Sequence, residues 1–130
     1  MTTDAVKRWS LEAVPATVPF LRAEVTDFAK AAGVAETPLV HVRLALTEAL
    51  TNAVIHGYGD DGAPGTVDLE VTITGADIRV VVADNGRGMR PRVGSAGIGI
   101  GLPLISAVAE SVEIQAREPQ GTELHIRFAR

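Results

Sequence analysis

The sequence predicts an α+β fold, a two-layer α/β sandwich with its helices on one face of a mixed, mostly antiparallel sheet. Apolar periodicity along the chain reads strand, helix, helix, strand, strand, helix, strand, strand. This order lacks the regular strand–helix alternation of a parallel doubly wound sheet. Short turn segments also join two pairs of consecutive strand patterns, which is typical of hairpins. Helices grouped on one face of the sheet fit this order best.

The first half of the chain predicts one strand and two helices. Residues 9–14 can form a short strand, and a helix is expected over residues 18–32, where apolar side chains recur at helical spacing. Gly33 suits the C-terminal stop of that helix. Thr37 and Pro38 favour the start of the next helix, as N-cap and first-turn residue. The apolar residues of this second helix are Val42, Ala45, Leu46, Ala49, Leu50, Ala53 and Val54.

The second half predicts two hairpins separated by a short helix. Residues 57–65 are rich in glycine, aspartate and proline, which indicates a loop. Residues 67–73 alternate apolar and polar side chains, and residues 78–83 are more continuously apolar, so both are predicted strands. A short helix is expected over residues 103–109. The last two strands lie within residues 112–128, around a Glu-Pro-Gln-Gly turn.

The composition favours a packed globular chain, because 46% of the residues are hydrophobic. We expect residues 1–130 to form one domain. A net charge of −4, without a basic run or interleaved aromatics, argues against a nucleic-acid partner. No stretch approaches the roughly 20 apolar residues of a membrane span, and no signal peptide is recognisable. The absence of cysteine excludes disulfides and thiolate zinc sites. These features predict a soluble cytoplasmic protein.

Two glycine-rich runs are the most informative motifs. Residues 84–88 read Asp-Asn-Gly-Arg-Gly, and residues 97–101 read Gly-Ile-Gly-Ile-Gly directly before the short apolar helix. Glycines let backbone N–H groups approach an anion closely, and a helix N-terminus adds partial positive charge. The Asp84 carboxylate can accept a hydrogen bond from an exocyclic amine. The two runs therefore offer one loop for a base and another for phosphates.

Other interpretations of these runs explain less. The Gly-x-Gly-x-x-Gly spacing of a Rossmann site is absent, and so is the Gly-Lys-Ser/Thr of a P-loop. Asp84 could simply cap a turn with the residues that follow it. A turn cap accounts for Gly86 but leaves Gly88 and the second run unexplained.

A third motif lies on the second predicted helix. Glu48 and Asn52 are four residues apart and share a face of that helix. A carboxylate and a carboxamide are hard oxygen ligands of the type that Mg²⁺ accepts, and the carboxylate could instead orient or deprotonate an attacking hydroxyl. The alternative is an ordinary polar stripe on an amphipathic helix. The glycine runs favour the functional interpretation. His56, near the helix end, is interpreted as packing rather than catalytic.

Together these three motifs closely resemble those of the histidine-kinase-like (GHKL) ATPase superfamily. The segment from Glu48 to Tyr58 looks like the N-box of its anti-sigma-factor serine/threonine kinase branch. Gly121-Thr122 resembles the closing strand signature, and residues 20–28 are similar to the first helix of that branch. The resemblance covers nearly the whole chain. It implies the Bergerat ATP-binding fold, with ATP and Mg²⁺ as cofactors.

The resemblance also implies a role for each matching residue. Glu48 would be the general base or water-orienting residue, and Asn52 the Mg²⁺ ligand. Asp84 would accept a hydrogen bond from the adenine amino group. Arg22 matches an exposed arginine with which members contact protein partners. The remaining ATP contacts would come from Gly86, Gly88, Met89, Gly97, Gly99, Gly101, Leu102 and Thr122.

By this likeness the chain would bind a sigma factor and phosphorylate a small anti-sigma-factor antagonist. Members commonly dimerise through the N-terminal strand region, which implies a homodimer. In one respect the chain departs from the kinase members, because only residues 90–96 separate Met89 from the second glycine run. Such a lid spans at most about 24 Å when fully extended and offers little surface to a protein substrate. A nucleotide-dependent protein-binding regulator without kinase activity therefore stays open as an alternative, as does a plain ATPase.

Overall fold

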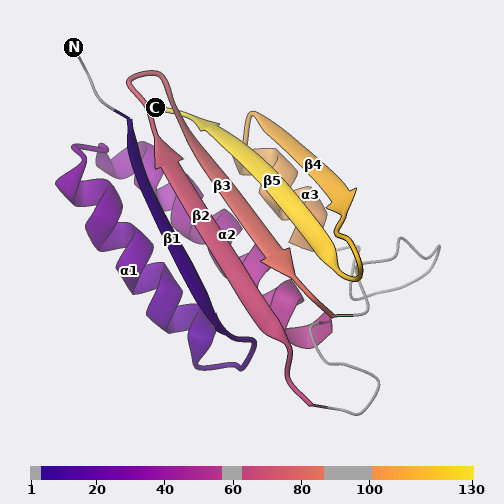
Figure 1. The fold of residues 1–130 in the computed structure, drawn as a ribbon. Coiled ribbons are helices and arrows are strands. Elements are labelled where there is room, and N and C mark those ends of the chain that lie inside the picture. The colour runs from indigo at the N-terminus through magenta and orange to yellow at the C-terminus, as the bar shows by residue number, and fades with distance from the viewer. Residues whose placement is uncertain (1–3, 57–62, 87–100) are drawn as a thin grey trace.

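The elements follow the order that the sequence predicts. The computed structural model describes residues 4–56, 63–86 and 101–130. Figure 1 shows the arrangement of these elements. In chain order they are β1 (Ala5–Glu12), α1 (Thr17–Ala31), α2 (Glu36–His56), β2 (Thr66–Ile73), β3 (Asp77–Asp84), α3 (Gly101–Val108), β4 (Ser111–Ala116) and β5 (Thr122–Ala129).

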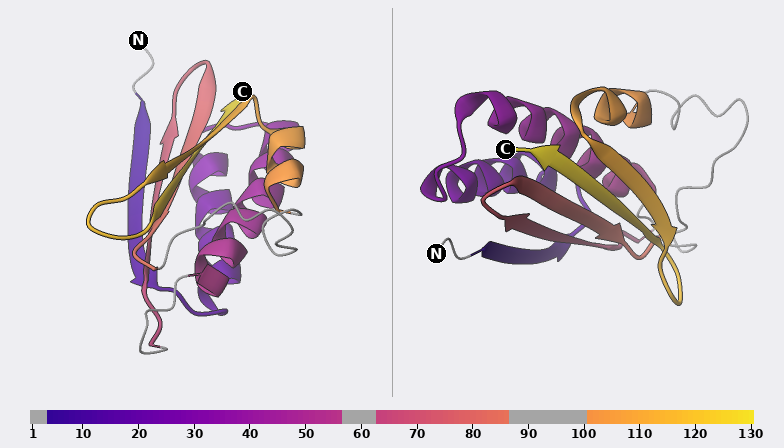
Figure 2. Two further views of the ribbon diagram at one scale, coloured as in Figure 1. Left: turned by 90° about the vertical axis from the view of Figure 1, so that its right-hand side faces the viewer. Right: turned by 90° about the horizontal axis from the view of Figure 1, so that it is seen from above.

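The strands form one five-stranded sheet in the order β1-β2-β3-β5-β4. Each of its four strand pairings is antiparallel, so the described residues contain no parallel pair. All three helices lie on one face of the sheet, and no described helix covers the other face (Figure 2). The predicted two-layer α+β architecture is therefore confirmed, but the described strands form an antiparallel sheet and not the mixed one expected. We call the uncovered side the open face.

Alternation along the strands separates the two faces. In β2 every second residue is buried, and β5 follows the same rule over most of its length. The register aligns Val71, Val80 and Ile126 across three neighbouring strands, all buried against the helices. Burying each such side chain stabilises the fold by about 1.5–3 kcal/mol. The polar residues between them lie on the open face.

The helix α2 is central to the helical layer, because it packs against α1, α3 and three strands. Its whole predicted apolar set is buried, and Leu39 joins it. At the outer strand, Trp9 meets Phe28 of α1 edge to face, with 6.3 Å between the ring centroids. The Trp9 Nε1–H donates to Glu24 Oε1 at 3.3 Å. These contacts hold α1 against β1 and leave α2 in the middle.

Two element boundaries differ from prediction for identifiable reasons. The strand β1 begins well before residue 9 because it pairs with β2 along its whole length, so its charged residues lie in a regular ladder. The helix α2 begins at Glu36, since Leu39 N–H already donates to the Ala35 carbonyl at 3.2 Å. Thr37 therefore lies in the first turn and is not the N-cap. Most of the predicted loop over residues 57–65 lies outside the described residues.

Candidate functional site

The predicted site residues on three different elements converge at one end of the molecule. Asn52 lies near the end of α2, Asp84 is the last residue of β3, and Thr122 is the first residue of β5. These element ends lie together at the lower end of the sheet in Figure 1. All three side chains are buried, with exposed fractions of 5%, 4% and 4%. The only other buried polar side chains in the described segments are Thr17 and Asp77. Three distant stretches of sequence thus place polar groups inside the same end of the core.

Asp84 and Thr122 are direct neighbours across the sheet. They are paired in the β3–β5 register, and Val67 of β2 completes their row. They continue the buried alternation of their strands, so both side chains face the helical layer. Residues opposite each other in an antiparallel pair have Cβ atoms about 4.5–5.5 Å apart. Asp84 and Thr122, the two residues that the resemblance places beside the base, therefore lie next to each other on the same face of the sheet.

The Asp84 carboxylate is held by the turn that follows it. Gly86, itself buried, donates its N–H to Asp84 Oδ1 at 3.0 Å. Asn85 Oδ1 accepts from the N–H of Thr66 at 2.8 Å, which fixes the turn to the start of β2. Asp84 is thus a turn cap, as the simpler interpretation holds, and also a buried acceptor aimed at the helices. The two interpretations are compatible.

Burial dominates the electrostatics of Asp84. Removal from water raises the pKa of the carboxyl above its ordinary value, because the charged form loses hydration. Three groups oppose that rise: the Gly86 N–H, and positive charge on His56 and on Arg117. His56, the last residue of α2, therefore acts on the site electrostatically. The site combines a buried acceptor with positive charge around it.

The side-chain amide of Asn52 is buried and contains an atom, Nδ2, whose hydrogen-bonding capacity is not satisfied by the described residues. Leaving a buried amide unpaired costs about 1–3 kcal/mol, so such an atom marks a place where a ligand is expected. An amide can donate to a phosphate oxygen through Nδ2, and its Oδ1 is a ligand suited to Mg²⁺. The chemistry of this side chain thus fits both groups implied by the resemblance.

Glu48 lies one helical turn before Asn52 on α2 and is half-buried, so it can meet both the interior and solvent. Arg22 lies beside the same stretch of α2, where its Nη1 donates to Thr47 Oγ1 at 3.4 Å. It is half-buried rather than fully exposed, because it packs between α1 and α2. The expected partner contact of Arg22 would therefore involve both helices.

The second glycine run is described only at its end. Gly101 begins α3, and Leu102 is half-buried and packs against the core. The helix thus starts at the last residue of the run, two residues before the predicted start at residue 103. The predicted ATP contacts of four other residues lie outside the described residues: Gly88, Met89, Gly97 and Gly99.

Gly121, for which the motifs predict no contact, lies against the site. Its φ of +119° belongs to the region that favours glycine. A Cβ there would lie 1.9 Å from the Asp84 carbonyl oxygen and 2.9 Å from the Asn85 Cα. Only glycine therefore lets the start of β5 approach the end of β3 this closely. Its place in the Gly-Thr pair before the last strand was the available signal.

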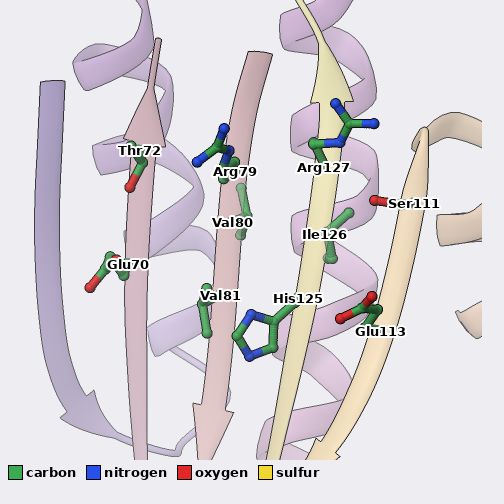
Figure 3. A pocket seen from close by; sticks show the side chains of 10 residues that line it. All are labelled: Glu70, Thr72, Arg79, Val80, Val81, Ser111, Glu113, His125, Ile126 and Arg127. Carbon is green, nitrogen blue, oxygen red and sulfur yellow. The ribbon is translucent and has the colours of Figure 1, made fainter. Parts of the chain in front are cut away.

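Two hollows on the open face form a contrast with this site. One has a volume of about 320 Å³ and is lined by residues of β2, β3, β4 and β5, among them Arg79, Glu113 and His125 (Figure 3). The other, of about 400 Å³, lies nearer β1 and is lined by Asp68 and Arg117 among others. None of the predicted site residues lines either hollow. The candidate site therefore belongs to the helical side of the sheet.

The described part of the chain offers neither a cluster of metal-ligating side chains nor a membrane-spanning helix. It contains no group of three or more His, Cys, Asp or Glu residues placed to hold a metal ion. It also contains no helix with the length and apolar character needed to cross a membrane.

Comparison with known proteins gives matches in sequence over most of the chain. Residues 11–128 match the family model described as histidine kinase-like ATPase domain. The anti-sigma F factor of Clostridium kluyveri is 29% identical in an alignment of 116 positions that covers 81% of this chain and 80% of that protein. The anti-sigma F factor of Bacillus thuringiensis is 26% identical in an alignment of 120 positions that covers 82% of this chain and 80% of that protein.

Two solved structures are similar in fold. The crystal structure of the RsbU and RsbW domains of Rv1364c from Mycobacterium tuberculosis matches with a TM-score of 0.75 and 22% identity. That match covers 97% of this chain and 33% of the other. The histidine kinase domain of the Erythrobacter litoralis EL346 blue-light activated histidine kinase matches with a TM-score of 0.57 and 21% identity, over 85% of this chain and 60% of the other. At these identities the structural matches support the fold.

Proposed function

The chain belongs to the histidine kinase-like ATPase domain family, and from this membership we propose that it is an ATP-binding anti-sigma regulatory factor with serine/threonine protein kinase activity. The observation that carries the proposal is the buried polar group at one end of the core. Asp84 and Thr122 are cross-strand neighbours there, and Asn52 Nδ2 has no hydrogen-bond partner among the described residues. A buried polar atom without a partner is rare in proteins, so this amide supports a ligand at the site.

In the proposed complex the adenine amino group donates to Asp84. The backbone N–H of Gly86 already holds one oxygen of this carboxylate in place, so little reorganisation is needed on binding. Thr122 lies beside the base, and Asn52 would hold Mg²⁺ at the phosphates. The ion would supply charge neutralisation at the transferred phosphoryl group.

Glu48 is the residue we propose for the chemical step. It lies one helical turn from Asn52 and is half-buried, so it can reach a hydroxyl brought to the phosphates. There it would orient the serine or threonine hydroxyl of a protein substrate and accept its proton. Catalysis of this type depends mainly on positioning and electrostatic stabilisation.

The partners we propose follow from the relatives, which are named anti-sigma F factors. They are a sigma factor, which acts in the cytoplasm, and a small antagonist protein as the phosphate acceptor. Arg22, seated between α1 and α2, is the proposed contact residue. We also propose a homodimer through β1, which is an edge strand of the sheet. Its outer edge has no strand partner in the described structure, and a second β1 could pair with it.

A regulator that binds nucleotide and partner without transferring phosphate is the second candidate. The short segment over residues 90–96 favours it, because a short lid offers little surface to a protein substrate. Transfer from labelled ATP to a candidate antagonist separates the two functions, since sequestration alone leaves no label on the acceptor. Release of phosphate without any acceptor would indicate a plain ATPase instead.

Calorimetric titration with ATP, with and without Mg²⁺, tests the proposed site. Asn52→Ala should lose the Mg²⁺-dependent part of the affinity, whereas Glu48→Ala should keep nucleotide affinity within severalfold and lose phosphate transfer. Val40→Ala, at an exposed position of the same helix, is a matched control that should behave like the wild type. Unchanged Mg²⁺ dependence in Asn52→Ala would remove this residue as the ligand, and full transfer activity in Glu48→Ala would remove Glu48 from the chemical step.

A further inference from the structure

The loop between β4 and β5 packs directly against the backbone of the candidate site. This loop, residues 117–121, is closed by a hydrogen bond from the Arg117 N–H to the Gly121 carbonyl at 3.0 Å. Gly121 in turn lies against Asp84, so close that any Cβ would overlap the Asp84 carbonyl. A displacement of this loop therefore displaces the strand end that carries the base-recognising carboxylate.

The side chain of Arg117 ties this loop to a strand on the other side of the site. Its Nη2 donates to Asp68 Oδ2 of β2 at 2.6 Å. Because β5 and β3 separate β4 from β2 in the strand order, this contact joins the loop to a strand that is not its neighbour, on the open face. Ala83 of β3 is the cross-strand partner of Asp68 and is only 6% exposed. Arg117, Asp68 and Ala83 line the same hollow, where the small alanine leaves room for the arginine.

Arg117 also acts on Asp84 through the sheet. Its positive charge is one of the groups that lower the pKa of the Asp84 carboxyl against the effect of burial. His56 contributes positive charge from the end of α2, and Glu123 of β5 lines the hollow beside Arg117. An ionised Asp84 is the stronger acceptor for a hydrogen bond from an amine. The Arg117–Asp68 contact, which holds the loop against Asp84, and the positive charge of Arg117, which favours ionised Asp84, therefore both support a site ready to accept an amine.

We propose that Arg117 is a positioning residue for base recognition: by binding Asp68 across the open face, it holds the 117–121 loop and Gly121 against Asp84. The proposal rests on the proposed binding of ATP. Arg117 does not touch the nucleotide in this scheme, because its side chain lies on the opposite face of the sheet. Its effect should appear in the discrimination between bases rather than in the affinity for phosphates.

A second ion pair on the same face serves as an internal comparison. Arg8 Nε donates to Glu70 Oε2 at 2.6 Å and joins β1 to β2. It equals the Arg117 pair in length but is more exposed, with side-chain exposed fractions of 72% and 39% against 29% and 34%. Both of its residues line the same hollow as Arg117, but no hydrogen bond or ion pair among the described residues joins either of them to the 117–121 loop or to Asp84. Loss of this pair should leave base recognition unchanged.

The test compares ATP with purine riboside triphosphate, which lacks the exocyclic amine, by calorimetric titration of the full chain. The wild type should prefer ATP by about tenfold or more, as expected for a hydrogen bond to a charged acceptor. Arg117→Gln should reduce that preference by about threefold or more while its affinity for the analogue stays within twofold. Asp68→Asn should give the same result from the other partner. Arg8→Gln is the matched control and should retain the wild-type preference.

Charge rescue distinguishes positioning from a general loss of stability. Arg117→Lys should retain most of the preference for ATP. The double variant Arg117→Asp with Asp68→Arg should recover preference that Arg117→Asp alone loses. A wild-type preference in Arg117→Gln, or an equal loss of affinity for both nucleotides, would overturn the proposal while leaving ATP binding itself intact. A wild-type protein that binds neither nucleotide would overturn the proposed function and this inference with it.

Discussion

The strand β3 begins and ends with a buried aspartate, and the surroundings of the two carboxyl groups shift their pKa values in opposite directions. Asp77 is 5% exposed and Asp84 is 4% exposed. Asp77 lies on the open face, where it accepts hydrogen bonds from Thr74 at 2.8 Å and from Arg79 at 3.2 Å. Arg127 approaches it to 3.6 Å. Asp84 faces the helical layer and accepts the N–H of Gly86.

The pKa values of the two carboxyls record this difference. The Thr74 hydrogen bond, together with Arg79 and Arg127, holds the pKa of Asp77 below its ordinary value despite burial. Burial raises the pKa of Asp84, and its partners only partly oppose it. Groups of the protein satisfy Asp77, whereas Asp84 is the carboxylate that we propose accepts a hydrogen bond from a ligand. The difference supports a structural role for Asp77 and the proposed binding role for Asp84.

The largest effect is expected at Gly121, which connects the two strands at the Asp84 end. Gly121→Ala combines an unfavourable φ with overlap against the Asp84 backbone, so it should lower the free energy of unfolding by about 3 kcal/mol or more. Urea denaturation measures the change. Gly75→Ala is the matched control, because a Cβ there meets nothing within 4 Å. Equal stability of the two variants would contradict the close approach of β5 to Asp84.

At the other end of β3, Asp77→Ala should lower the free energy of unfolding by about 1–3 kcal/mol, because a buried hydrogen-bond network loses its acceptor. Arg79 and Arg127 are half exposed and can be rehydrated, so most of the loss comes from Thr74. Affinity for Mg²⁺-ATP should stay within twofold of the wild type, since Asp77 lies at the far end of the strand. A tenfold loss of affinity would show that the two ends of β3 are not independent.

For Asp84→Asn the expectation is reversed. The carboxamide keeps an oxygen for the Gly86 N–H and removes a charge that burial disfavours. The free energy of unfolding at neutral pH should therefore be unchanged or higher. Affinity for ATP should fall about tenfold or more, because the charged acceptor is lost. A clear loss of stability in thermal unfolding would show that Asp84 is a structural residue like Asp77.

The smallest effects should appear in the pH dependence of stability. Because the folded pKa of Asp77 lies below its unfolded value of 3.8, its stabilising contribution is complete above pH 3.8 and is lost as the pH falls through the folded value. The pKa of Asp84 in the folded protein lies above the unfolded value of 3.8. Its unfavourable contribution to stability therefore develops as the pH rises above 3.8 and is complete once the pH exceeds the folded pKa. Unfolding of the wild type, Asp77→Ala and Asp84→Asn between pH 3 and pH 7 measures both trends. Parallel curves for the three proteins would contradict these assignments.

Local sequence signals predict most of the fold and the location of the site. Alternation in β2 and β5 and the apolar stripe of α2 are strong signals, because each follows from burial on one face. Membership in the histidine kinase-like ATPase family confirms the resemblance that the motifs indicated. The sequence does not predict the first residues of β1, because Lys7 and Arg8 interrupt the alternation of apolar and polar side chains that indicates a strand. Ladder pairing with β2 decides its structure instead.

The sequence did not predict the residues that support the candidate site from the neighbouring strand and loop, Gly121 and Arg117. Gly121 matters because β5 pairs with β3, and Arg117 matters because its side chain reaches Asp68, which is distant in the chain. Both depend on strand order, which periodicity does not encode. The expected roles of Glu48, Asn52 and Thr122 in binding and catalysis stay predictions, as do those of the glycines outside the described residues.

Calorimetric titration of Mg²⁺-ATP into the wild type, Asp77→Ala and Asp84→Asn tests the central claim most directly. The account predicts that the wild type and Asp77→Ala bind with similar affinity and that Asp84→Asn binds about tenfold or more weakly. Equal affinity of all three proteins for ATP would contradict the assignment of Asp84 as the acceptor for the base.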